Sequence, residues 1–203
     1  MTPDSQSRQR IVVGAADMIR RRGLNATSVR ELAKHADTPL GSTYHYFPGG
    51  KRQLAVEAVR FAGDMVSAVL RARLADGPVA GLRAFLGLWR DVLIGTAFRA
   101  GCPVLAVSVE EPSEHSVDVR EGAEDEPSAQ AAAAGVFADW QALLTDCLRR
   151  QGVEAVRSEQ LAALIIASVE GAIVMCRAQR SIEPFDKVCA QLKELVTAVI
   201  DNR

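Results

Sequence analysis

Apolar residues recur every three or four positions along most of this chain, and that period is typical of α-helices. The first repeat places Ile11, Ala15, Met18 and Ile19 on one face, and Gly23 follows as the expected end of that helix. No stretch alternates apolar and polar residues as a strand does, and no hairpin signal is present. The pattern therefore predicts an all-α protein of about nine helices.

Glycine and proline mark where the predicted helices end. Gly77-Pro78 interrupts one apolar repeat, Gly101 and Pro103 interrupt the next, and Gly152 ends a third. The segment from residue 110 to residue 128 is polar and acidic, so it favours a mobile loop. Near the end of the chain, the stretch from residue 158 to about residue 179 is apolar on almost every side of the predicted helix. Such a helix must pack against other helices on more than one face.

Residues 27–54 indicate two short helices joined by a tight turn, followed by a third helix from Lys51. Ser28 and Glu31 have the spacing of a capping box, so a helix is expected to begin after Ser28. Thr38 is the expected N-cap of the second helix, and Pro39 suits its first position. This is the arrangement of a helix-turn-helix, whose second helix enters the DNA major groove.

The same stretch resembles the DNA-binding segment of the TetR family of bacterial transcriptional repressors. The residues that fit are Thr27, Ser28, Leu32, Ala33, Ala36, Gly41, Tyr44, Tyr46, Phe47, Lys51 and Leu54. Asp37 stands where the family usually has a turn glycine, and aspartate also tolerates a left-handed turn. The segment Pro48-Gly49-Gly50 is one residue longer than the commonest spacing.

Three further features are similar to the LmrA/YxaF-like branch of that family. They are the run from Phe47 to Lys51, Gly101-Cys102-Pro103, and Glu170-Gly171-Ala172 followed by Arg177-Ala178. The resemblance implies a three-helix DNA-binding domain in residues 1–50. It also implies a helical domain in residues 51–203 that binds a ligand and forms a homodimer.

The helix-turn-helix geometry suggests which side chains would meet a double-stranded operator. The N-terminal part of the second helix lies in the groove, so the candidate base readers are Thr38, Leu40, Ser42 and His45. The hydroxyls of Tyr44 and Tyr46 and the ammonium of Lys51 are candidates for phosphate contacts. The resemblance places Arg30 near a base or a phosphate. Phe47 is expected to pack in the core.

The resemblance also implies sites in the second domain. The family holds a small-molecule effector among these helices, and the aromatic residues Trp89, Phe137 and Trp140 are the candidates for contacting it. Such a pocket favours a small, mostly apolar, aromatic or planar compound. The family dimerises through its last two helices, so the interface candidates are Leu161, Leu164, Leu192 and Val196.

The distribution of charge agrees with a DNA-reading segment on an acidic body. The whole chain has 24 Lys and Arg against 25 Asp and Glu, a net charge of −1. Residues 1–60 contain 10 basic and 5 acidic residues, which leaves 14 and 20 in the remainder. The excess of basic charge therefore lies around the helix-turn-helix. The polar beginning suggests no secretory signal, and we expect a cytoplasmic protein that makes no membrane contact.

Other functions would need residues that the sequence supplies only weakly. The cysteines Cys102, Cys147, Cys176 and Cys189 form no C-x-x-C pair, so we expect no cofactor and no zinc site. We see no catalytic constellation for an all-α enzyme. A redox sensor would need a reactive Cys102, and a metal sensor would use His115 with the nearby acidic residues Glu111, Glu114 and Asp118.

Glu170 is a charged residue inside an apolar stretch, and its role stays open at this stage. It could face a cationic group of a ligand, pair with an arginine across the subunit interface, or cap a local hydrogen bond.

Overall fold

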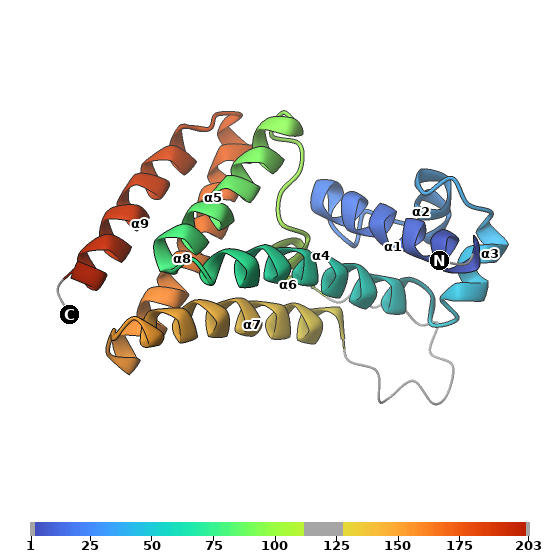
Figure 1. Cartoon of the computed structure of the whole chain (residues 1–203). Helices are drawn as coiled ribbons and strands as arrows, with labels where there is room; N and C mark the ends of the chain where they lie inside the picture. Colours follow the sequence, from blue (N-terminus) through green and yellow to red (C-terminus); the bar gives the residue numbers. More distant parts are fainter. Residues whose placement is uncertain (1–2, 112–127, 202–203) are drawn as a thin grey trace. The chain divides into compact units, whose positions relative to one another are not determined.

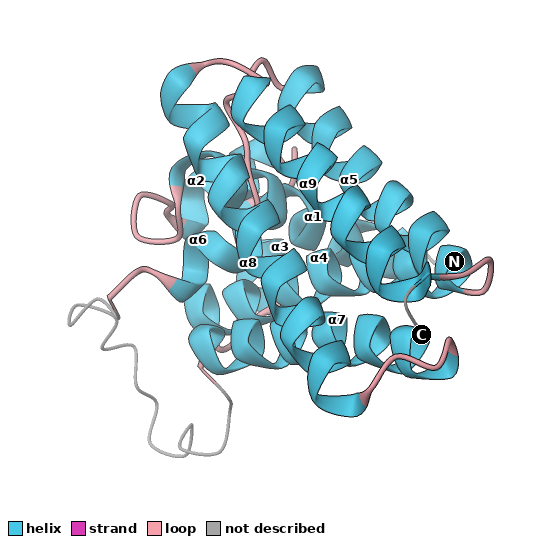
Figure 2. Cartoon of the chain, turned by 90° about the vertical axis from the view of Figure 1, so that its left-hand side faces the viewer, coloured by secondary structure: helices cyan, strands magenta, loops and turns pink. Residues whose placement is uncertain are grey.

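The computed structural model describes residues 3–111 and 128–201, and over those ranges the chain forms nine α-helices and no β-strand (Figure 1; Figure 2). The all-α prediction is confirmed. In chain order the helices are α1 (Pro3–Arg22), α2 (Val29–His35), α3 (Leu40–Tyr46), α4 (Gly50–Leu74), α5 (Pro78–Gly95), α6 (Pro103–Ser108), α7 (Ala129–Arg150), α8 (Ala155–Gln179) and α9 (Glu183–Asp201).

Several helices end or begin at the residues that the sequence indicated. Gly23 and Gly152 have positive φ angles of 84° and 86° just after α1 and α7, which is a conformation that glycine adopts without strain. Pro78 lies in the first turn of α5, directly after Gly77. The carboxylate of Glu154 accepts hydrogen bonds from the amides of Val156 and Arg157, and so caps the start of α8.

The helices divide into two compact units. The first contains residues 1–63 and 103–136, and the second contains residues 64–102 and 137–203. The long helices α4 and α7 contribute to both. The expected division at residue 50 follows a different criterion, the end of the DNA-binding segment, and it stays a prediction.

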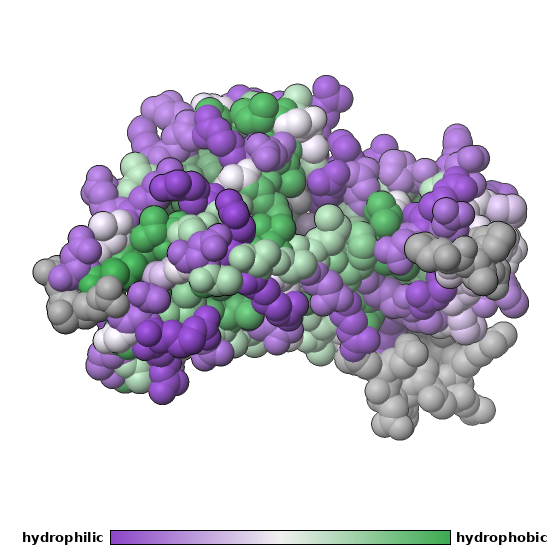
Figure 3. Space-filling model, in the orientation of Figure 1, coloured by the Kyte–Doolittle hydropathy of each residue, from purple (hydrophilic) through white to green (hydrophobic). Residues whose placement is uncertain are grey.

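In the first unit, α1 is the central helix and packs against α2, α3 and α6. Its predicted apolar face is buried, with Ile11, Ala15, Met18 and Ile19 at most 5% exposed. Phe47 is 1% exposed, as expected for a core residue, and it anchors the end of α3. The surface over α1, α2 and α3 is mainly hydrophilic (Figure 3).

In the second unit, α8 packs against α9 and α5, and α5 packs against α9, so these three helices lie side by side (Figure 1). Their contact faces are apolar: Phe85 of α5, Val169 of α8 and Phe185 of α9 are each fully buried. Apolar side chains also reach the surface over α5 and α9 (Figure 3). At about 25 cal/mol per Å² of buried apolar area, this packing is the main stabilising term of the unit.

Candidate functional site

The turn between α2 and α3 is built by side chains of α1 and α2. Ser28 and Glu31 form the predicted capping box at the start of α2. Asp37 has a φ angle of 50°, so it takes the left-handed conformation that the turn requires. Arg10 donates hydrogen bonds to the carbonyl oxygens of Ala36, at 2.8 Å, and of Asp37, at 3.1 Å. The arginine thus fixes the turn that sets the direction of α3.

The prediction that Thr38 caps α3 is wrong. The residue before α3 is Pro39, which has no side-chain donor or acceptor and makes no side-chain cap. The Thr38 hydroxyl instead donates to the carbonyl oxygen of Ala33, 3.3 Å away at the end of α2. Thr38 therefore satisfies a carbonyl group near the end of α2, where the last carbonyls of a helix lack partners within the helix.

The second helix of this pair, α3, exposes most of the predicted DNA-reading residues. Leu40 is 36% exposed and Tyr44 is 51% exposed, and His45 is also exposed. Ser42, Tyr46 and Thr38 are partly exposed. Arg30 of α2 is exposed. These side chains are therefore accessible to a duplex, whereas Thr43 and Phe47 face the interior.

Lys51 lies in a more enclosed position than the sequence suggested. Its ammonium nitrogen is 3.4 Å from the carbonyl oxygen of Asn25, to which it donates a hydrogen bond. Burial lowers the pKa of Lys51, and the carboxylate of Glu110 opposes that shift. The Lys51 side chain therefore braces the loop between α1 and α2, and a phosphate contact would compete with this bond.

Glu110 was not singled out by the sequence, yet it ties the end of α6 to the loop after α1. Its carboxylate accepts hydrogen bonds from the amides of Leu24, at 2.8 Å, and Asn25, at 2.6 Å. A side-chain carbon at Gly23 would lie 2.0 Å from the same carboxylate and would displace it, and the φ angle of 84° favours glycine there. No sequence signal marks this pairing, because the partners are 86 residues apart.

We expect Glu110→Ala to loosen the loop after α1. Two amides lose their acceptor, so unfolding free energy should fall by about 1–2 kcal/mol and the amides of Leu24 and Asn25 should exchange faster with solvent. Hydrogen exchange followed by mass spectrometry measures both effects. Glu111→Ala is the matched control, since Glu111 contributes only its backbone oxygen to Asn25. Equal exchange in both variants would contradict the role of the Glu110 side chain.

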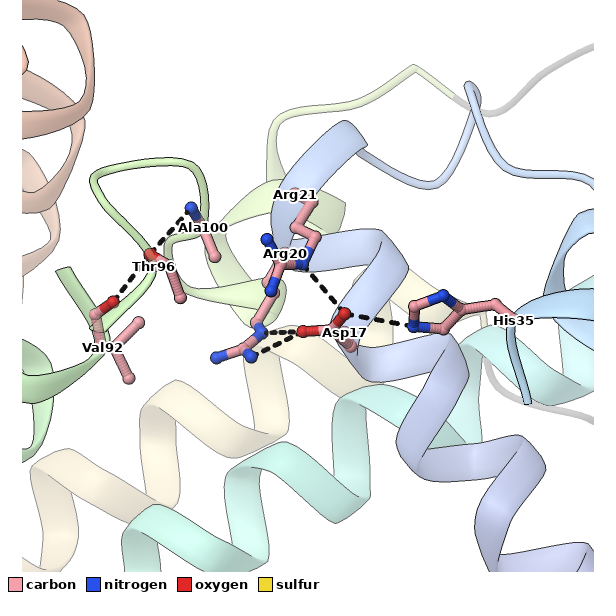
Figure 4. A network of polar contacts seen from close by, with 7 residues as sticks. All are labelled: Asp17, Arg20, Arg21, His35, Val92, Thr96 and Ala100. Atoms are coloured by element: carbon pink, nitrogen blue, oxygen red, sulfur yellow. Dashed lines mark hydrogen bonds and ion pairs between the residues drawn. The ribbon is translucent and has the colours of Figure 1, made fainter. Parts of the chain in front are cut away.

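Asp17 of α1 collects three basic side chains of the first unit (Figure 4). Its carboxylate accepts hydrogen bonds from Arg20 at 2.5 Å and Arg21 at 2.9 Å, and it lies 3.2 Å from the imidazole of His35 on α2. Partial burial would raise the pKa of Asp17, but the hydrogen bonds from Arg21 and Arg20 outweigh it and lower the pKa. The cluster joins α1 to α2 behind the turn.

The predicted ligand residues come together in the second unit as an aromatic cluster. The ring centroids of Trp89 and Trp140 are 6.4 Å apart, and those of Phe137 and Trp140 are 5.6 Å apart, both in edge-to-face geometry. Phe85 contacts both tryptophans. Trp89 and Trp140 are buried and Phe137 is partly exposed. Phe98 lies in the loop after α5, which a hydrogen bond from the Thr96 hydroxyl to the Val92 carbonyl helps to shape (Figure 4).

Two features of the resemblance that are far apart in the sequence converge in the second unit. Gly101 lies against α8, where an added side-chain carbon would be 3.1 Å from Ile173 and 3.1 Å from Arg177. The thiol of Cys102 forms a hydrogen bond with Glu170. Burial raises the pKa of Glu170 to about 7, and this hydrogen bond opposes the shift. Glu170 is 5% exposed, so this carboxyl is a buried titratable group.

The predicted interface residues separate into two groups. Leu161, Leu192 and Val196 are at most 2% exposed within the single chain, because the apolar face of α9 packs against α8 and α5. Their role as contacts to a second subunit stays a prediction, and within the single chain these three side chains are enclosed. Leu164 is 46% exposed, and Val174 and Met175, also on α8, are about half exposed at 52% and 49%.

The residues of the alternative sensors are not placed for that chemistry where the structure describes them. Cys102 is buried, as are Cys147, Cys176 and Cys189. Burial raises the pKa of the Cys189 thiol to about 11. Within residues 3–111 and 128–201, no three His, Cys, Asp or Glu side chains are grouped as metal ligands. His115, Glu114, Asp118 and most of the expected mobile loop lie outside the described residues.

One described helix, α8, is long and apolar enough to cross a membrane by length and composition alone. Half of its most apolar window is buried inside the chain. Ser168 and Glu170 interrupt the apolar run of this helix. A helix that packs against other helices in a protein core can be as apolar as a membrane span. Because α8 packs against α5 and α9, we interpret it as a core helix.

Two family models match the chain. The model described as "Bacterial regulatory proteins, tetR family" matches residues 11–58, which include α2 and α3. The model described as "Transcriptional regulator LmrA/YxaF-like, C-terminal domain" matches residues 78–191.

Similar proteins cover nearly the full length of the chain. An "Uncharacterized HTH-type transcriptional regulator" of Mycobacterium tuberculosis is 40% identical, with 97% of both chains covered. The "Uncharacterized HTH-type transcriptional regulator YxaF" of Bacillus subtilis is 27% identical, with 97% of this chain and 98% of that protein covered. The crystal structure of a regulatory protein TetR from Rhodobacter sphaeroides has a TM-score of 0.73 at 21% identity, covering 92% and 96% of the two chains, which shows the shared fold.

Proposed function

This chain belongs to the TetR family of bacterial regulatory proteins, with a C-terminal domain of the LmrA/YxaF-like type, and we propose that it is a cytoplasmic repressor that a small molecule releases from a palindromic operator. DNA binding by a helix-turn-helix is the shared property of this family of transcriptional regulators. The repressor role, the effector and the dimer are the specific parts of the proposal.

The observation that carries the proposal is the exposed face of α3. Leu40, Tyr44 and His45 project from a short helix whose opposite side is held in the core by Thr43 and Phe47. A rigid helix with accessible side chains can enter a major groove without rearranging the unit that supports it. The hydroxyl of Tyr44 on α3 and the guanidinium of Arg30 on α2 are two of the exposed hydrogen-bond donors that we propose contact DNA.

A second copy of the chain would supply the second half-site reader. Supporting this, α8 exposes a stripe of apolar and small residues on the side away from its buried face: Leu164, Ala167, Gly171, Val174, Met175 and Ala178. Small residues let two helices approach closely, and large exposed apolar groups gain from burial. We therefore place the proposed dimer face on this stripe of α8, which includes the predicted contact Leu164.

The mechanism we propose is a two-state coupling between effector and operator. The aromatic cluster around Trp89 and Trp140 would bind a small, mostly apolar and planar effector. The bound state would favour a spacing of the two α3 helices that does not match successive major grooves. Linkage then requires the operator to weaken effector binding by the same free energy, typically about 1–3 kcal/mol.

A direct test measures binding to the DNA that flanks the chain's own coding region, cut into short labelled duplexes. We expect one palindromic fragment to bind tightly as a dimer, with affinity that falls steeply as salt is raised, since phosphate contacts release counterions. Fluorescence anisotropy gives the affinity and sedimentation gives the stoichiometry. Equal affinity for every fragment and for scrambled DNA would contradict the operator proposal.

Arg30 and Tyr44 are expected to contribute differently to that binding. Tyr44→Phe should weaken binding to operator and scrambled duplexes alike, because a phosphate contact carries no sequence information. Arg30→Ala should reduce the operator preference by about 1–3 kcal/mol if the guanidinium reads a base. Lys34→Ala, an exposed basic residue on the same helix, is the matched control for loss of charge. Equal losses on both duplexes for Arg30→Ala would make Arg30 a phosphate contact.

A further inference from the structure

Glu170 is a buried carboxylate of the second unit that has no charged partner among the described residues. It lies midway along α8, is 5% exposed, and has the fully buried neighbours Val169 and Ile173 on the same helix. Within residues 3–111 and 128–201, neither carboxylate oxygen has a hydrogen-bond partner that satisfies ordinary geometry. A buried acid in this state destabilises the folded chain, so its presence requires an explanation.

Structural pairing does not supply that explanation in the described part of the chain. Arg177 is the basic residue two helical turns further along α8, and its side chain lies against Gly101, where an added carbon would be 3.2 Å from Nη1. Glu170 forms no ion pair with it or with any other described side chain. The Cys102 thiol, the other polar neighbour, carries no positive charge.

A second buried polar group in the same unit also lacks a partner. The indole nitrogen of Trp89 is enclosed and has no acceptor among the described residues. Trp89 lies on α5, which packs directly against α8, and it belongs to the aromatic cluster with Phe85 and Trp140. An unpaired acid and a set of aromatic faces on adjoining helices are the two groups that together attract an organic cation.

We propose that Glu170 recognises the effector, by accepting a hydrogen bond from a protonated nitrogen of a planar aromatic compound whose rings lie against Trp89 and Trp140. This rests on the proposed function only in calling the compound an effector. Binding of the cation itself is a property of the second unit. The inference thus narrows the ligand from an apolar planar compound to an aromatic cation.

The test uses two probes of the same ring system, 9-aminoacridine as the cation and acridine as the neutral compound at about pH 8. Quenching of tryptophan fluorescence and the shift in melting temperature report binding to the full-length protein, and anisotropy with operator DNA is measured separately. Glu170→Gln removes the negative charge with little change in shape. Glu159→Gln makes the same change on the same helix at an exposed position, and serves as the control.

We expect 9-aminoacridine to bind the wild type and Glu159→Gln, and to bind Glu170→Gln about 10- to 100-fold more weakly, as for loss of a charged hydrogen bond. Acridine should bind all three proteins equally and more weakly. Equal binding of 9-aminoacridine to the wild type and Glu170→Gln, or no binding of it to the wild type, would overturn the inference. Operator binding that persists in these proteins would leave the repressor proposal standing, so the two can fail separately.

Discussion

Leu164→Glu is expected to convert the dimer to a monomer and to weaken operator binding by about 10²–10⁴-fold, which is the advantage that two linked half-site contacts give over one. The leucine is 46% exposed on α8 in the single chain, so a charge there is tolerated by the isolated subunit. In a dimer that uses the α8 stripe, the same charge would be buried without a partner. Sedimentation velocity measures the first effect and fluorescence anisotropy the second.

Two further variants make that result specific. Gln9→Glu adds a charge at an exposed polar residue of α1, which is not part of the α8 stripe, and should leave the dimer intact. Leu192→Glu places a charge at a side chain that is 2% exposed within the subunit, so we expect loss of the folded structure itself. Circular dichroism separates unfolding from dissociation. A folded, dimeric Leu164→Glu variant would show that the interface lies elsewhere.

Glu170→Gln is expected to make the protein more stable than the wild type at neutral and alkaline pH. Burial raises the pKa of Glu170 from 4.5 to about 7 in the folded chain. The folded state therefore holds a proton that the unfolded state releases, and wild-type stability falls as the pH rises from about 4.5 to about 7. At about 1.36 kcal/mol per unit of pKa, the loss is on the order of 3 kcal/mol.

The measurement is urea unfolding of wild type, Glu170→Gln and Glu159→Gln at about pH 5, 6, 7 and 8, at one protein concentration. All other titrating groups are common to the proteins, so the difference between wild type and Glu170→Gln isolates this carboxyl. That difference should grow with pH and then level off, while Glu159→Gln follows the wild type. A constant difference across the range would mean that Glu170 ionises as freely in the folded chain as in water.

The local signals that the sequence carries were sufficient for the fold class and the helix-turn-helix. The repeat of Ile11, Ala15 and Met18 encodes a buried helix face directly, because the period of a helix is a property of the backbone. The capping box at Ser28 and the left-handed turn at Asp37 are also local, since each involves residues within a few positions of one another. The family resemblance pointed to Trp89, Phe137 and Trp140, and in the structure Trp140 contacts both of the others.

What only the tertiary structure decided depends on contacts between distant segments. An apolar residue on α8 or α9 can face its own subunit or a partner subunit, and the sequence pattern is the same in both cases. In the structure, the packing of α9 on α8 and α5 encloses Leu192 and Val196, whereas Leu164 stays on the surface. The tie from Glu110 to Leu24 and the confinement of Lys51 join segments that no local rule connects. The sequence alone left three possible roles open for Glu170. The tertiary structure encloses Glu170 beside the Cys102 thiol and away from any charged partner among the described residues, and this enclosure is the basis of the ligand proposal.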